Sequence, residues 1–239
     1  MHRSGTSLVC RLLAQLGVSF GDPAQHYPAD RWNPDGYFED RAVMDLNSRI
    51  VTGWPRNRSR LAAFAAKLAY LRMPGDAAIA RRAARQQTAL RALAARFRDG
   101  AVKDPRFCLT LRFWLDAAAV SHVVVCLRHP AAVVASLARR DRLPPALAAR
   151  FFAWHVDRLL AQLPAGRAVF VDIARLAVEP GELDALRRAV GRAAGPSSAD
   201  LLAQLVRPAA LTAAPVTDCA PVAEAAWRRL WAAARREPA

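Results

Sequence analysis

The chain has 239 residues, of which 54% are hydrophobic and 23% charged. This composition excludes a disordered chain and is sufficient for a buried core in one domain over residues 1–239. The 35 basic and 20 acidic residues give a net charge of +15, but 33 of the basic residues are arginines spread along the whole chain. Arginines distributed in this way reflect the overall composition of the chain and do not form a focused basic patch. We therefore expect no specific nucleic-acid partner.

The cysteines and the apolar segments exclude further classes of protein. The four cysteines are far apart, with no Cys-x-x-Cys pair, which excludes a disulfide framework and a zinc site. The longest segment without a charge, residues 117–127, has 11 residues and is too short to span a bilayer. Arg11 interrupts the first apolar segment, which argues against a signal peptide. We therefore expect a cytoplasmic protein without a membrane span.

Helical patterns separated by loops fill the first half of the chain. Apolar residues at helical spacing predict a first helix over residues 8–16. A loop rich in proline, aspartate and asparagine follows over residues 21–36, and a second helix is expected over residues 39–51. Residues 57–99 have helical periodicity that Pro74-Gly75 interrupts, which predicts two helices.

Strand and helix patterns alternate in the second half. Short apolar runs predict three strands, over residues 101–103, 122–127 and 168–171. The remaining helices are expected over residues 109–118, 131–140, 146–163 and 223–236. Strands that alternate with helices at this spacing predict an α/β fold with a mostly parallel sheet.

The first group of candidate site residues stands at the beginning of the first predicted helix. These residues are Arg3, Ser4, Gly5, Thr6 and Ser7. Backbone N–H groups and the positive end of the helix dipole form an anion site there, to which arginine adds a fixed charge. The frame of a Walker A loop is absent. The alternative is a plain helix cap, since serine and threonine are favoured caps.

A second group follows the predicted strand at residues 122–127. Arg128 stands at the carboxyl end of that strand, Pro130 opens a helix, and Ser136 lies eight residues beyond Arg128. Ligands of open parallel sheets bind at the carboxyl ends of strands, so Arg128 and Ser136 together could hold one phosphate. The alternative is an arginine that is simply solvated.

Two further passages carry candidate catalytic groups. Lys103 ends the strand predicted at residues 101–103, and Asp104 follows it. A compact lysine ammonium suits charge that develops on a leaving oxygen. Glu39 and Asp40 end a turn that leads into a helix. Chance placement is the alternative for Lys103. The two acids could also simply favour the helix dipole, which is the interpretation we prefer for Asp40.

In their order along the chain, the four passages resemble the sulfotransferases that use 3′-phosphoadenosine 5′-phosphosulfate (PAPS), in particular their bacterial carbohydrate and small-molecule branch. The resemblance covers residues 1–180 and includes the Asn-Pro-x-Gly-x-x-Glu and Lys-Asp-Pro-Arg runs. It implies that residues 3–7 cradle the 5′-phosphosulfate and that Arg128 and Ser136 hold the 3′-phosphate. It also implies a three-layer, P-loop-like α/β fold.

The activity implied by the resemblance is transfer of a sulfuryl group from PAPS to a hydroxyl, with an amine as the lesser alternative, of a carbohydrate or small molecule. Lys103 would stabilise the leaving oxygen. Because Pro105 stands where the cytosolic members carry a catalytic histidine, we assign the general base to Glu39, with Asp104 second. No metal is required. The alternatives are a non-catalytic nucleotide-binding remnant of the fold and a small-molecule kinase with an atypical phosphate loop.

One departure from the family concerns the segment before the phosphate loop. In the family a central strand precedes this loop, whereas here only Met1 and His2 precede Arg3. We expect Met1 to be an internal methionine and an apolar strand to be encoded upstream. The 239-residue chain would then bind nucleotide weakly.

Overall fold

The structure, a computed structural model, describes residues 2–56, 59–206 and 219–236. Its contacts divide the chain into two compact units. Unit 1 comprises Met1–Val18 and Ser121–Ala239, and unit 2 is the intervening segment Ser19–Val120. A single domain over residues 1–239 stays a prediction.

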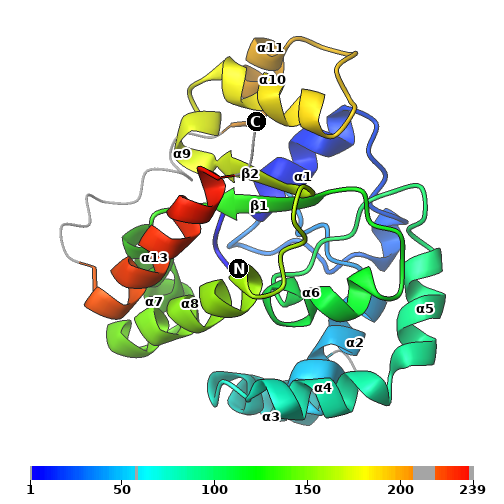
Figure 1. Cartoon of the computed structure of the whole chain (residues 1–239), viewed down its shortest axis with the longest axis vertical. Helices are drawn as coiled ribbons and strands as arrows, with labels where there is room; N and C mark the ends of the chain where they lie inside the picture. The colour runs from blue at the N-terminus through cyan, green and yellow to red at the C-terminus, as the bar shows by residue number, and fades with distance from the viewer. Residues whose placement is uncertain (1, 57–58, 207–218, 237–239) are drawn as a thin grey trace. The chain divides into compact units, whose positions relative to one another are not determined.

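A two-stranded parallel sheet lies in unit 1. Strand β1 (Val123–Leu127) pairs with β2 (Ala168–Asp172), and the two arrows lie side by side in Figure 1. Parallel neighbours need a long crossover, and helices α7 (Pro130–Asp141) and α8 (Pro145–Leu160) provide it. The strands predicted at residues 122–127 and 168–171 are thus confirmed, as is the mixture of helices with a parallel sheet.

The other described helices of unit 1 precede and follow this crossover. They are α1 (Thr6–Gln15), α9 (Ile173–Leu176), α10 (Pro180–Ala189), α11 (Ser198–Leu205) and α13 (Pro221–Ala234). Helix α13 packs along α8, and α1 contacts α11. The core of the unit is apolar: Leu12, Val133, Leu176 and Leu183 are all completely buried. Three of these helices, α9 to α11, were not predicted.

Unit 2 is helical in its described part. It contains a 3₁₀ turn, η1 (Pro23–Gln25), followed by α2 (Arg41–Thr52), α3 (Arg60–Leu71), α4 (Asp76–Ala84), α5 (Gln87–Ala95) and α6 (Phe107–Leu115). Helix α2 contacts each of the four helices that follow it. Among the described helices of the chain, none is long and apolar enough to cross a membrane.

Two predictions for unit 2 were wrong. Residues 101–103 form no strand: the Ala101 N–H donates one hydrogen bond to the Ser19 carbonyl, at 2.7 Å, without a ladder around it. The sheet of the described residues therefore has two strands and not three. Residues 57–99 contain three described helices where two were expected, because the helix after Pro74-Gly75 breaks again at Arg85-Gln86.

Candidate functional site

The loop before α1 adopts a backbone conformation that requires glycine at one position. The φ angles of Arg3 and Gly5 are 63° and 79°, so the chain turns sharply before Thr6. A Cβ atom on Gly5 would lie 2.8 Å from Cγ2 of Ile173, which leaves no room for a side chain. Met1 lies outside the described residues, and the strand expected before it stays a prediction.

The N-terminus of α1 is not capped by a side chain. The cap residue is Gly5, and no acidic residue stands in the first turn of the helix. Ser4 is buried, whereas Thr6 and Ser7 are half-buried. The positive end of this helix dipole is therefore not offset by a carboxylate of its own first turn.

Two segments far apart in the sequence meet at this loop. Arg3 Nε donates a hydrogen bond to Ser136 Oγ at 2.7 Å, and Arg128 Nη1 donates to the Arg3 carbonyl at 2.9 Å. Arg128 directly follows β1, and Ser136 is a buried residue of α7, whose first turn is capped by His129. The structure thus brings together Arg3, Arg128 and Ser136, three of the residues predicted to hold the nucleotide.

Arg128 feels the positive charges of two other arginines. Burial, and then the charges of Arg3 and Arg139, all lower the pKa of Arg128 below its ordinary value. A bound anion would offset these positive charges, and phosphate suits the planar arginine fork.

The predicted catalytic residues Glu39 and Lys103 form an ion pair within unit 2. Lys103 Nζ lies 2.5 Å from Glu39 Oε1, and it also donates to the Tyr37 carbonyl at 3.1 Å. Both side chains are buried, so little water screens this pair. The carboxylate and the ammonium are therefore held against each other in a fixed arrangement.

Asp104, the second choice for the base, is engaged by another residue. Arg106 Nη1 lies 2.9 and 3.0 Å from the two oxygens of Asp104, and the Arg106 backbone N–H donates to the same carboxylate at 2.8 Å. Burial raises the pKa of Asp104, and the Arg106 charge opposes that shift. With both oxygens occupied, Asp104 has a structural role in this arrangement.

Asp40 is the N-cap of α2, as preferred from the sequence. Its carboxylate accepts hydrogen bonds from the backbone N–H groups of Ala42 and Val43, at 2.8 and 3.1 Å. Arg96 donates to its other oxygen at 3.1 Å. Asp40, the acid next to Glu39, therefore caps α2.

Sequence reasoning missed Arg56, which lies among the charged groups of unit 2. Burial and the charge of Arg106 lower the pKa of Arg56, whereas Glu39 is among the groups that raise it. In a chain where nearly every basic residue is an arginine, one arginine in a loop gives no signal in the sequence.

The predicted site residues thus fall into two sets, with the nucleotide residues in unit 1 and the catalytic residues in unit 2. Comparisons with protein-family models, with curated proteins and with solved structures found no match.

Proposed function

We propose that the chain is a PAPS-dependent sulfotransferase with a P-loop-like fold. The observation that carries the proposal is the direct contact of Arg3 with Ser136 and Arg128. These residues come from the two segments that we expected, from the resemblance alone, to hold the phosphates of one nucleotide. A cytoplasmic location remains part of the proposal.

The hydrogen bonds of this cluster leave suitable donors for a phosphate. Because Ser136 Oγ accepts from Arg3 Nε, its own O–H is left to donate to a ligand oxygen. Arg128 uses Nη1 for the Arg3 carbonyl, and the rest of its guanidinium can bind a phosphate. In the proposal, Arg128 and Ser136 bind the 3′-phosphate, and the N-terminus of α1 binds the 5′-phosphosulfate.

The proposed reaction is an in-line displacement at sulfur. The acceptor oxygen bonds to sulfur while the bond from sulfur to the bridging oxygen breaks, and 3′-phosphoadenosine 5′-phosphate (PAP) leaves with the electron pair. Glu39 takes the proton of the acceptor, and the Lys103 ammonium stabilises the charge on the bridging oxygen. Such a reaction depends chiefly on positioning and on charge stabilisation.

The ion pair between Glu39 and Lys103 affects whether these two residues can play the roles assigned to them. One oxygen of the Glu39 carboxylate, which would take the proton, already accepts a hydrogen bond from the Lys103 ammonium. The acceptor and the nucleotide must therefore draw the two groups apart for both to act. A chain that kept this pair closed would bind nucleotide without turnover, which is the observation that favours the non-catalytic alternative.

Two measurements test the proposal: which nucleotide the chain binds, and whether it converts PAPS to PAP. We expect calorimetry to show binding of PAP in preference to ATP, and we expect the chain to release PAP from PAPS when supplied with hydroxyl acceptors. Preference for ATP would favour a kinase instead. Binding of PAP without release of PAP from PAPS, across a broad acceptor set, would identify the non-catalytic remnant.

Variants of the ion pair test the assigned roles. We expect Glu39→Gln to lower kcat by about a hundredfold to ten-thousandfold, the usual range for loss of a general base. Lys103→Ala should lower kcat far more than it weakens PAPS binding, because its charge acts on the transition state. Lys67→Ala is the matched control, since Lys67 is the other lysine of the chain and is exposed. Normal turnover in Glu39→Gln would exclude Glu39 as the base.

A further inference from the structure

Helix α3 turns its large apolar side chains outward. Leu61, Phe64 and Leu68 are 77%, 58% and 45% exposed. Their spacing of three and four residues places them on one face of the helix, which we call the α3 stripe. The residues of α3 that are buried are Ala66 and Tyr70. An exposed apolar stripe of this kind marks an interaction surface rather than a face that is stable in water.

The charged residues of α3, and the residue that follows it, are all basic. At 100° per residue, Arg60 and Lys67 border one side of the stripe and Arg72 the other, and all three are exposed. The sequence contains no acidic residue between Asp45 and Asp76. The exposed apolar face is therefore combined with a rim of one charge sign.

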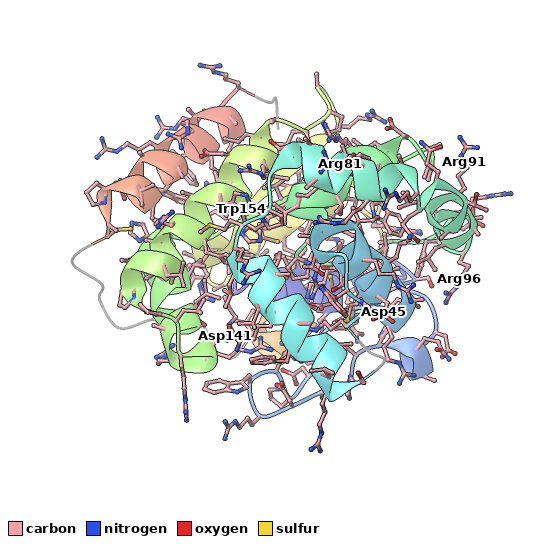
Figure 2. All side chains as sticks on the ribbon, turned by 90° about the horizontal axis from the view of Figure 1, so that it is seen from below. Asp45, Arg81, Arg91, Arg96, Asp141 and Trp154 are labelled. Carbon is pink, nitrogen blue, oxygen red and sulfur yellow. The ribbon has the colours of Figure 1, made fainter. Side chains whose placement is uncertain are left out.

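An aromatic side chain precedes the helix. Trp54, which lies shortly before α3 in the chain, is 50% exposed. Tryptophan prefers the boundary between an apolar phase and water, because its ring is apolar and its indole N–H is a donor. In Figure 2, which looks from below, α3 is the bright cyan helix at the front of unit 2. The stripe thus belongs to an outer helix of its unit.

We propose that the α3 stripe docks onto an anionic lipid surface. The apolar side chains would enter the boundary between headgroups and acyl chains, while the rim of Arg60, Lys67 and Arg72 would bind anionic headgroups. With 12 residues, α3 would lie in the plane of the surface. This proposal is independent of the proposed nucleotide chemistry, because none of its residues holds the nucleotide.

The charge pattern argues against a second copy of the chain as the partner. In a two-fold symmetric dimer, the same patch meets itself, so each basic rim would face a basic rim. Like charges brought together in this way oppose association. An anionic lipid surface satisfies the apolar stripe and the rim together.

Co-sedimentation with vesicles tests the proposal. We expect the full chain to sediment with vesicles of phosphatidylcholine and phosphatidylserine, and not with phosphatidylcholine alone. Added salt should weaken the binding, since salt screens the rim. Lys67→Gln should reduce the affinity by about fivefold, the usual effect of one basic residue near such a surface. Arg91→Gln, which removes an exposed arginine of α5 labelled in Figure 2, is its control and should have a smaller effect.

The double variant Leu61→Ser with Phe64→Ser removes the apolar part of the stripe. We expect it to lose vesicle binding while its circular dichroism and its PAP binding stay unchanged, because both side chains are exposed. Val178→Ser is the matched control, since Val178 is 75% exposed in unit 1. Three results would overturn the proposal: no sedimentation with phosphatidylserine vesicles, equal loss in Val178→Ser, or a stripe that instead holds two copies of the chain or an acidic protein together.

Discussion

Gly5 and Gly17 provide a matched pair at the two ends of α1. Both have a φ of +79°, but a Cβ on Gly17 would meet no atom within 4 Å, whereas one on Gly5 would meet Ile173 at 2.8 Å. We expect Gly17→Ala to lower the free energy of unfolding by about 1 kcal/mol, the cost of the left-handed conformation. Gly5→Ala should cost about 2–4 kcal/mol, since overpacking adds to that cost.

Chemical denaturation of both variants measures this difference. The cost of Gly5→Ala should shrink in an Ile173→Ala background, because the alanine removes the clashing atoms. Equal costs for the two glycine variants would show that Ile173 does not press on the loop before α1.

Because of Tyr70, we expect the stability of the folded chain to depend on pH in the alkaline range. Its burial raises the pKa of the phenol above the ordinary value near 10. The unfolded chain therefore loses this proton before the folded chain does, so the associated stability is complete below about pH 10 and declines above it. We expect the decline to be about 1.4 kcal/mol per pH unit for this one proton.

Denaturant unfolding between neutral and alkaline pH measures the effect. Tyr70→Phe should flatten the pH dependence by one proton, and Tyr27→Phe, which changes a half-buried phenol, is the control. A slope that is the same in the wild-type chain and in Tyr70→Phe would contradict the assignment.

At the scale of single residues, the sequence identified groups better than it identified their partners. Their place after a predicted strand, and then the resemblance, selected Arg128 and Ser136 for one phosphate, and both contact Arg3. The ion pair of Glu39 with Lys103 was not predicted, because side chains 64 residues apart leave no periodic pattern. Asp104 received a catalytic role that its engagement by Arg106 does not favour.

At the scale of elements, we expect the N-cap of α2 to contribute to the stability of the fold. Asp40 is buried and accepts two backbone N–H groups of α2. Asp40→Ala should therefore lower the free energy of unfolding by about 1–2 kcal/mol, the usual cost of a lost cap. Asp22→Ala is the control, since Asp22 caps the exposed three-residue turn η1. Thermal and chemical unfolding should rank the two variants in that order, and an equal effect would mean that α2 does not need its cap.

Helices with a proline at the start were predicted well, and the breaks without such a signal were not. Helices α7 and α8 begin at Pro130 and Pro145, within one residue of their predicted starts. The break between α4 and α5 falls at Arg85-Gln86, two residues that favour helix, so no local pattern could reveal it. The strand at residues 101–103 failed because pairing depends on a neighbouring strand and not on the segment itself.

At the scale of the whole molecule, the two units do not simply follow one another along the chain. Unit 2 is an insertion between the first 18 residues and the rest of unit 1. Contacts such as that of Arg3 with Ser136, 133 residues apart, can only come from the tertiary fold. Composition excluded a disordered chain, but it carried no signal for this division.

Calorimetry with PAP and with adenosine 5′-phosphate tests whether Arg128 and Ser136 bind the 3′-phosphate, as we propose. A charged hydrogen bond contributes about 1.5–3 kcal/mol, so Arg128→Ala and Ser136→Ala should each weaken PAP binding by about ten- to a hundredfold. Binding of adenosine 5′-phosphate should stay nearly unchanged, and Arg150→Ala, an exposed arginine of α8, should leave both affinities unchanged. Equal losses for the two nucleotides in Arg128→Ala and Ser136→Ala, or no binding of PAP by the wild-type chain, would contradict the claim.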